Sequence, residues 1–182
     1  GWRMKAVCIT PDGHARCVPD SATILRRNPW FVPADGTPGQ WRATLYAGAV
    51  IDRLGMCIRA KFAGRYYSRL AVCAAMGNPG ADADYAWIRD GALVVGDVQP
   101  EVADGITSVR LAGEPEREYS LPAAEDLDRA IEAVSAFMTL KTGDMVLLPI
   151  GCDVPVPEPP MDLAVEACTE GGQLRLLLFK AR

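Results

Sequence analysis

One segment, residues 41–52, constrains the fold more than any other part of the chain. Its side chains suit a β-strand, in which neighbouring residues point to opposite faces of the sheet and residues two apart share a face. One face would carry Thr44, Tyr46, Gly48 and Val50, and the other Ala43, Leu45, Ala47, Ala49 and Ile51. The segment therefore predicts a long strand on which Thr44 and Tyr46 lie side by side.

Shorter apolar runs predict further strands, which turn-forming residues separate. These strands are expected at residues 4–9, 30–32, 66–76, 92–98, 106–111, 116–121, 163–168 and 174–179. Turns at residues 11–13, 77–80 and 171–172 consist of glycine, proline, asparagine and aspartate, each of which favours a reversal of the chain. Residues 82–85 would form an exposed loop. The chain is therefore expected to be predominantly β.

Only residues 123–138 favour a helix, because their apolar side chains recur with the helical period. These side chains are Leu127, Ala130, Ile131, Val134 and Phe137, and Pro122 stands near the entry. By contrast, residues 149–160 hold five prolines, which lack the backbone N–H that a sheet requires. We expect an ordered surface loop there. A proline-rich ligand for an SH3-like partner is the alternative.

Composition indicates one globular domain, residues 1–182, with 49% hydrophobic and 23% charged residues. No apolar run approaches the roughly 18–20 residues that cross a bilayer, and no export signal opens the chain, so we expect a cytoplasmic protein without a membrane partner. The net charge of -4 argues against nucleic acid as a partner. The basic stretch at residues 53–69 is expected to be a solvated or interface surface.

Cysteine and histidine, which often bind metals or act in catalysis, offer few combinations in this sequence. Six cysteines contain no close pair and His14 is the only histidine, so a structural zinc site is not expected. Reduced, mostly buried thiols are expected instead, above all at Cys8 and Cys73. His14 near Cys17 is the alternative for a catalytic thiol.

Two other catalytic arrangements are compatible with the residue types. A Ser-His-Asp site would combine His14 with Ser21 or Ser68. A cation could be held by acidic residues that follow one another closely, although a solvated acidic loop is the alternative. These acidic residues are Asp82, Asp84, Asp90 and Asp97.

Two ordered sets of residues resemble the fumarylacetoacetate hydrolase family. Ser135 and the string TLKTGD at residues 139–144 resemble the turn with which a helix of that family enters a core strand, although Thr142 stands where the family has proline. Further matches follow the order of a bacterial branch of the family. They comprise Pro19-Asp20-Ser21-Ala22, Pro29 to Pro33, Arg53-Leu54-Gly55, Phe62-Ala63, Arg65-Tyr66-Tyr67 and Asp90.

The resemblance implies a mixed β-sandwich or roll, like the C-terminal domain of the family, with one main helix. It also implies Mg²⁺ or Mn²⁺ held by two glutamates two residues apart on a strand and by one aspartate, stabilising an enolate as a carbon–carbon bond breaks. Matching through Arg53-Leu54-Gly55 places the glutamates at Thr44 and Tyr46. Counting from Arg65-Tyr66-Tyr67 places the aspartate at Ala75. This chain is therefore expected to hold no metal and no other cofactor.

Other functional positions of the family have also changed. The resemblance implies that Val18 occupies the position of a family lysine. A second family lysine corresponds to Trp87 or its neighbourhood, upstream of the matched Asp90. A substrate-binding Thr-Gly-Thr-Pro segment corresponds to residues 148–151, which include Leu148 and Ile150. The family's mobile lid is missing, and His14 is a candidate for its remnant. We expect these positions to line the former site together with Thr44, Tyr46 and Ala75.

Two functions from different classes are compatible with this pattern. The loss of every carboxylate favours a non-catalytic protein: a dimeric scaffold, a ligand-binding protein or the partner of an active relative, as a homodimer or heterodimer. The alternative is a residual or altered hydrolase, decarboxylase or isomerase that acts on acylpyruvate-, fumarylacetoacetate- or oxaloacetate-like keto acids. Tyr46 or His14 would then be the acid or base.

Overall fold

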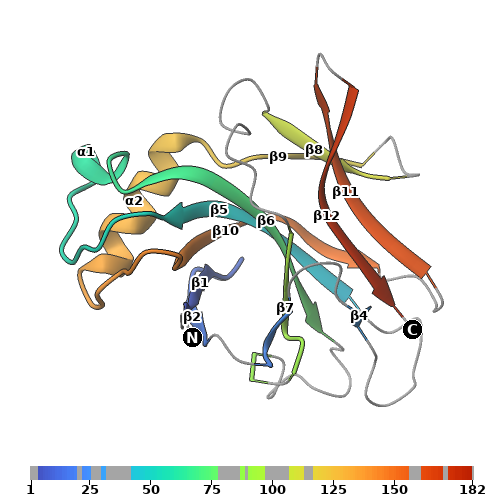
Figure 1. Ribbon diagram of the computed structural model, residues 1–182, viewed down its shortest axis with the longest axis horizontal. Helices are drawn as coiled ribbons and strands as arrows, with labels where there is room; N and C mark the ends of the chain where they lie inside the picture. Colours follow the sequence, from blue (N-terminus) through green and yellow to red (C-terminus); the bar gives the residue numbers. More distant parts are fainter. Residues whose placement is uncertain are drawn as a thin grey trace.

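A computed structural model gives the fold (Figure 1). The description covers residues 4–19, 22–25, 30–31, 42–77, 87–88, 90–96, 107–112, 117–155, 161–169 and 172–181. Within these ranges the chain forms two β-sheets and the helices α1 (Ala60–Ala63) and α2 (Ala124–Ser135). Neither helix is long and apolar enough to cross a membrane.

The first sheet has the order β2-β1-β10-β5-β6-β7-β3. Its strands are β1 (Ala6–Ile9), β2 (Ala15–Val18), β3 (Ile24–Leu25), β5 (Arg42–Ile51), β6 (Tyr67–Gly77), β7 (Leu93–Val95) and β10 (Met145–Pro155). The pairs β1–β10 and β3–β7 are parallel, and the other pairs are antiparallel. The sheet is therefore mixed, as expected.

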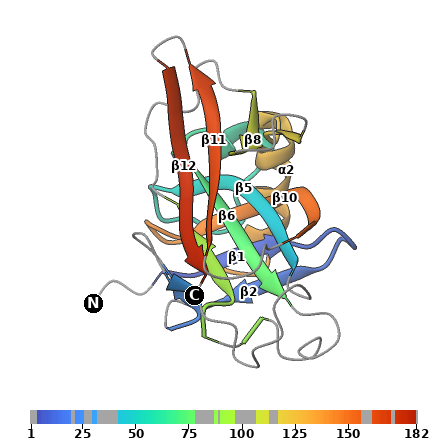
Figure 2. The same cartoon turned by 90° about the vertical axis from the view of Figure 1, so that its right-hand side faces the viewer.

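The second sheet has the order β4-β12-β11-β8-β9. Its strands are β4 (Trp30–Phe31), β8 (Ser108–Leu111), β9 (Glu118–Ser120), β11 (Met161–Thr169) and β12 (Gly172–Ala181). Figure 2 shows β11 and β12 lying across β5 and β6, and buried side chains of both sheets form one apolar cluster there. The strands predicted at residues 106–111 and 116–121 correspond to the antiparallel pair β8–β9, and those predicted at residues 163–168 and 174–179 correspond to β11–β12.

The alternation predicted for residues 41–52 is confirmed in β5. Tyr46 and Val50 point to one side of the sheet, which we call the inner face. Leu45 points to the opposite side, the outer face, and packs against the second sheet. Ala49 and Ile51, also on the outer face, pack under α2. The second sheet and α2 thus cover different ends of the outer face, while the inner face has an apolar cluster of its own.

The structure corrects the loop expected at residues 149–160, because β10 continues as a strand to Pro155. In the described part of the chain, β1 pairs with β10 only at residues 145–147. Beyond Leu147, β10 is an edge strand that pairs with β5 through irregular register near Pro149 and Gly151. Proline is tolerated at edges and bulges, where no ladder donor is needed. Residues 156–160 lie outside the described ranges.

Three short elements, β2, β3 and α1, were not predicted. The first three residues of β2 are exposed and carry no apolar alternation, so only the pairing with β1 makes them a strand. The other predicted elements are confirmed within a few residues at their ends. The loop expected at 82–85 lies outside the described residues.

The cysteines divide into two groups. Cys8 and Cys73 are buried free thiols, as expected. Cys17, Cys57 and Cys152 are also free but exposed, so the expectation of mostly buried thiols is wrong for them. Burial raises the pKa of the Cys8 thiol to about 12, with a smaller contribution from Cys17. Cys8 is therefore a protonated core residue at neutral pH.

Candidate functional site

The three positions at which the resemblance places metal ligands lie on two neighbouring strands. Thr44 of β5 pairs directly with Ala75 of β6, and Tyr46 pairs with Cys73. Thr44 and Tyr46 are two residues apart and share the inner face. Ala75 packs against the apolar cluster that contains Tyr46. The structure thus brings Thr44, Tyr46 and Ala75 together.

Apolar contacts surround Tyr46, whose side chain is 1% exposed. Its ring meets the ring of Trp87 edge to face, with the centroids 6.2 Å apart and the planes at 72°. Burial, followed by the nearby Cys8 thiol, raises the pKa of the Tyr46 phenol. The phenol is therefore neutral at physiological pH. The cluster also contains Ala6, Cys8, Val18, Cys73, Leu93, Val95, Met145 and Leu147.

These residues do not fit the metal that the resemblance implies. Mg²⁺ and Mn²⁺ prefer several hard oxygen ligands, of which carboxylates are the most common. The three positions offer one hydroxyl, one protonated phenol and one methyl group. Elsewhere in the described ranges, no three His, Cys, Asp or Glu side chains gather where they could hold a metal ion.

The other positions named from the sequence divide between the two faces. Val18 and Trp87 belong to the inner-face cluster with Tyr46. Leu148 and Ile150 lie on the outer face, where they pack against the α2 cluster and the second-sheet cluster, respectively. Asp90 is exposed at the surface. Leu148 and Ile150 therefore do not join the inner-face positions.

His14 lies in the exposed turn between β1 and β2. Its Nδ1 is 3.0 Å from Oδ2 of Asp12, and its backbone N–H donates to the Thr10 hydroxyl over 3.1 Å. The hydrogen bond from Thr10, followed by that from His14, lowers the pKa of Asp12 to about 2. These contacts hold the turn. Ser68, named as a possible partner of His14, instead donates to Asp52 over 3.0 Å.

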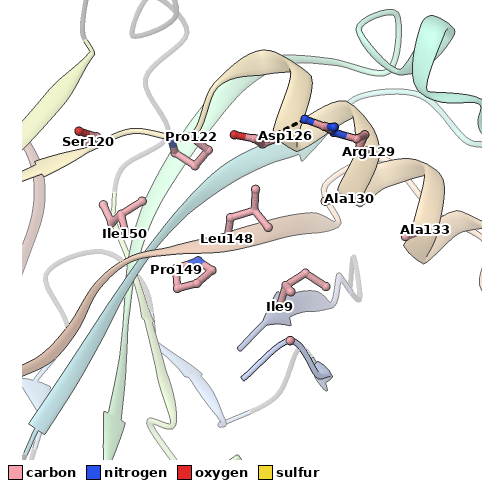
Figure 3. Close-up of a pocket in the computed structure, with 11 residues that line it drawn as sticks. Ile9, Ser120, Pro122, Asp126, Arg129, Ala130, Ala133, Leu148, Pro149 and Ile150 are labelled. Carbon is pink, nitrogen blue, oxygen red and sulfur yellow. Dashed lines mark hydrogen bonds and ion pairs between the residues drawn. The ribbon is translucent and has the colours of Figure 1, made fainter. Parts of the chain in front are cut away.

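A cleft of about 600 Å³ opens on the outer face between α2 and β10 (Figure 3). Apolar side chains form much of its lining, and Asp126 and Arg129 pair at 3.1 Å on the α2 side. The lining residues include Ile9, Pro122, Ala130, Ala133, Leu148 and Ile150. Its volume falls within the range of ligand sites, about 300–1,000 Å³. The sequence named Leu148 and Ile150 but did not predict the cleft, which requires α2 to lie against β10.

Several residues that carry the resemblance bind two loops together at the α1 end of the first sheet. Gly55 and Leu140 exchange backbone hydrogen bonds of 2.8 and 3.0 Å. The buried Ser135 hydroxyl accepts the backbone N–H of Ile58 over 2.9 Å. A Cβ on Gly55 would lie 2.6 Å from a ring carbon of Tyr66, so any other residue there would force its neighbours to shift. These matches have a structural role.

Asp144 has a similar role at the end of the TLKTGD string. Its carboxylate is 1% exposed and accepts hydrogen bonds from the Lys5 backbone N–H, the Lys5 ammonium and the Lys141 backbone N–H, at 3.0, 2.5 and 2.8 Å. Gly143 adopts a φ of +92°, which glycine tolerates best. The string therefore joins β1 to the start of β10.

No protein-family model matches the chain, and no curated protein matches its sequence. Solved structures do match. One is a protein from Yersinia pestis CO92 assigned to the fumarylacetoacetate hydrolase family, with 14% identity, a TM-score of 0.71, and coverage of 98% of this chain and 92% of that one. A 2-hydroxyhepta-2,4-diene-1,7-dioate isomerase from Mycobacterium marinum has 20% identity, a TM-score of 0.71, and coverage of 97% and 73%.

A third similar structure is the fumarylpyruvate hydrolase from Pseudomonas aeruginosa, in complex with Mn²⁺ and pyruvate. It has 15% identity, a TM-score of 0.65, and coverage of 99% of this chain and 89% of that one. Identities this low establish a common fold and leave the activity of this chain open. The chain therefore has the fold of the fumarylacetoacetate hydrolase family protein from Y. pestis and of these two enzymes.

Proposed function

We propose that the chain is a member of the fumarylacetoacetate hydrolase family that works without the family's metal chemistry, as a binding or scaffolding protein. One observation carries this proposal. Thr44, Tyr46 and Ala75 occupy one region of the inner face, yet none of them supplies an anionic oxygen at neutral pH. Without such ligands these positions do not bind a hard divalent cation. An enolate would then lack the metal ion that stabilises its negative charge.

Burial around Tyr46 supports a structural use of the inner face. Tyr46, Cys8, Cys73 and Leu147 are each at most 1% exposed, so these side chains serve as core. Binding then falls to the outer surface, where a cleft lies beside α2. The partner is a second copy or an active relative, and an apolar ligand is the remaining candidate. A cytoplasmic location belongs to the same proposal.

Metal analysis tests the proposal. Protein purified without chelators would be analysed by inductively coupled plasma mass spectrometry and titrated calorimetrically with MnCl₂ and MgCl₂. The Mn²⁺-binding fumarylpyruvate hydrolase from P. aeruginosa serves as the positive control. We expect no stoichiometric metal in this chain. One equivalent of Mg²⁺ or Mn²⁺, lost in a Thr44→Ala variant, would overturn the proposal.

An altered hydrolase, decarboxylase or isomerase of keto acids is the second candidate. It is supported by the neutral phenol of Tyr46 at a former ligand position, because a protonated phenol can act as a general acid. Turnover of acylpyruvates, fumarylacetoacetate and oxaloacetate would be compared among the wild type, Tyr46→Phe, His14→Ala and heat-denatured protein. This candidate requires turnover that depends on Tyr46 or His14. Rates equal to the heat-denatured control would exclude it for these substrates.

A further inference from the structure

Exposed apolar side chains gather at one end of the molecule. Five large hydrophobic side chains are exposed in the described ranges, and four of them lie in the loop before α1, in α1 itself or just after α2. These four are Leu54, Met56, Phe62 and Phe137, which are 65%, 54%, 40% and 89% exposed. We call this end, residues 53–66 and 136–142, the α1 tip. Figure 1 shows α1, the connecting loops and the end of α2 together there.

Backbone hydrogen bonds hold the α1 tip in this shape. The backbone N–H of Cys57 donates to the Ser135 carbonyl over 2.7 Å, and Gly55 and Leu140 exchange backbone hydrogen bonds. The backbone is therefore fixed on both sides of Met56, which keeps this side chain out of the core. Apolar side chains that are held in water cost free energy unless another surface covers them, and a contiguous group of them commonly marks an interaction site.

Cations surround these apolar side chains. The α1 tip contains five lysine and arginine residues and no acidic residue, although the whole chain has a net charge of -4. Arg59 also lies 3.4 Å from Glu132 of α2, which offsets part of its charge. The tip is thus a positively charged end of a protein that is acidic as a whole. Its five cations are all exposed and are Arg53, Arg59, Lys61, Arg65 and Lys141.

Two aromatic rings of the tip lie directly beside cations. Nζ of Lys61 is 4.9 Å and the guanidinium carbon of Arg65 is 5.0 Å from the centroid of the Phe62 ring. The guanidinium carbon of Arg53 is 5.9 Å from the centroid of the Tyr66 ring. Long basic side chains can lay their methylene groups on apolar surface and keep the charged end in a polar layer. The tip therefore offers apolar and cationic groups side by side, as a surface that binds at a lipid–water boundary requires.

We propose that the α1 tip binds the surface of a bilayer that contains anionic phospholipids. In this arrangement Leu54, Met56 and Phe137 enter the boundary between headgroups and acyl chains, and the cations pair with the acidic groups of the lipids. The sequence expectation of no membrane partner rested on the lack of a spanning segment, which a peripheral contact does not need. This inference goes beyond the binding or scaffolding role proposed above and does not depend on the cleft beside α2.

The shape and chemistry of the tip favour lipid over other acidic surfaces. Leu54 and Met56 are aliphatic and offer no ring on which nucleic-acid bases would stack. The exposed apolar side chains come from three separate segments at an end of the molecule (Figure 1), so a protein partner would need a matching pocket for each. Fluid acyl chains adapt to such a surface. Anionic lipids are characteristic of the cytoplasmic leaflet, which agrees with the location proposed above.

Co-sedimentation with vesicles provides the first test. Wild-type protein would be mixed with vesicles of phosphatidylcholine alone, or of phosphatidylcholine with about 30% phosphatidylserine, at NaCl concentrations between about 0.1 and 0.5 M. We expect binding to the anionic vesicles that weakens about tenfold or more over this range of salt, because salt screens the attraction between the cations and the lipids. Binding to the neutral vesicles should be weaker at every salt concentration.

A charge-reversal variant tests the cations of the tip. Lys61→Glu/Arg65→Glu should weaken binding to the anionic vesicles about 25-fold or more, since each cation near such a surface contributes about fivefold. Arg16→Glu/Arg117→Glu is the matched control, because it has the same net charge and changes exposed residues in β2 and just before β9. The control should bind far more strongly than the tip variant.

A second variant tests the apolar side chains. Leu54→Ser/Phe137→Ser should weaken binding about tenfold or more, because two apolar side chains that leave water on binding are lost. Ile88→Ser is the control, since Ile88 is 69% exposed and follows Trp87, which packs against Tyr46 on the inner face. Circular dichroism would confirm that all variants fold.

Cys57 provides an independent test, because it is an exposed thiol within the tip. A polarity-sensitive fluorophore would be attached to Cys57 after Cys17, Cys152 and Cys168 are replaced by serine. The control carries the fluorophore at Cys152 instead, in the part of β10 that pairs with the start of β5, at the opposite end of that strand from the tip. We expect anionic vesicles to shift the emission to shorter wavelength at Cys57 and not at Cys152.

Three outcomes would overturn the inference: no binding to anionic vesicles, tip variants that bind as strongly as their controls, or equal fluorophore responses at Cys57 and Cys152. The first includes a tip that recognises only an acidic protein. Failure here is distinguishable from failure of the proposed function. A metal-free protein that ignores vesicles overturns only this inference, whereas a vesicle-binding protein with stoichiometric Mn²⁺ overturns only the proposed loss of metal chemistry.

Discussion

Thr44 of β5 lies directly opposite Ala75 of β6 in the antiparallel pairing, so the two side chains emerge next to each other on the inner face. Directly opposed residues have Cβ atoms about 4.5–5.5 Å apart. Carboxylates at these two positions would reach a common cation, whereas a hydroxyl and a methyl group provide no charge. The pairing thus places two side chains where carboxylates could share a cation, although neither side chain in this protein is charged.

This arrangement predicts that carboxylates would restore metal dependence. In a Thr44→Glu/Ala75→Asp variant, two adjacent carboxylates should repel and lower the melting temperature in EDTA. Millimolar MnCl₂ should then raise it by about 5 °C or more, because a ligand that binds only the folded state stabilises it. Thermal circular dichroism measures both effects. Thr44→Gln/Ala75→Asn is the neutral control, and an equal Mn²⁺ response in the two variants would show that the positions do not share a cation.

Alkaline pH should destabilise the protein through Tyr46. Burial raises the pKa of its phenol above the value of about 10 in an unfolded chain. A folded pKa above the unfolded one gives a stabilisation that is complete below about pH 10 and is lost as the pH rises further. In urea titrations, the free energy of unfolding of wild type relative to Tyr46→Phe should fall by up to about 1.4 kcal/mol per pH unit above pH 10. Parallel pH curves for the two proteins would contradict this prediction.

Gly55→Ala should destabilise the junction between the two loops. The new Cβ would lie 2.6 Å from a ring carbon of Tyr66 and 2.9 Å from Cδ1 of Ile58, so the neighbours must shift. Overpacking of this kind costs about 1–3 kcal/mol. Gly64→Ala is the matched control, because nothing lies within 4 Å of its new Cβ and its φ of -60° is helical. Equal unfolding midpoints in urea would refute the proposed close packing.

Removing the Asp144 carboxylate should be more costly than removing an exposed one. Asp144→Ala leaves the Lys5 ammonium and two backbone N–H groups without their acceptor in a largely buried site. Loss of one partner of a buried pair costs about 3–5 kcal/mol. Glu125→Ala removes an exposed carboxylate that pairs with Arg129 at 3.3 Å, which should cost less than about 1 kcal/mol. Chemical denaturation compares the two, and similar losses would argue against a special role for Asp144.

Thiol labelling should separate the cysteines by burial. At pH 8 the exposed Cys17, Cys57 and Cys152 should react with a thiol reagent in the folded protein. Cys8 and Cys73 should react only after unfolding, because both are buried and the pKa of Cys8 is raised to about 12. Peptide mass mapping identifies each site. Labelling of Cys8 in the folded protein would show that the inner face is open.

The main strands and the helix could be predicted because their signal is local. The helical period over residues 123–138 reflects burial of one face of α2, whereas residues 41–52 form a strand that is buried on both faces and has few charged side chains. Both signals lie within one continuous stretch of sequence. Residues 149–160 were predicted wrongly for the complementary reason. A segment that contains prolines can form a strand if no neighbouring strand needs hydrogen bonds from those prolines. In the described part of the chain, β1 pairs with β10 only as far as Leu147, so the prolines beyond it need no donor on that side.

The candidate site, too, could be predicted only in part from the sequence. Strand alternation and residue type are enough to predict that Thr44 and Tyr46 share a face and that neither is anionic. Only the tertiary structure placed Ala75 opposite Thr44, because the register between β5 and β6 is set by packing on both faces of the sheet. It also decided that Leu148 and Ile150 line an outer cleft with α2, away from Tyr46. Contacts between elements distant in sequence depend on how the layers pack, and no local pattern encodes them.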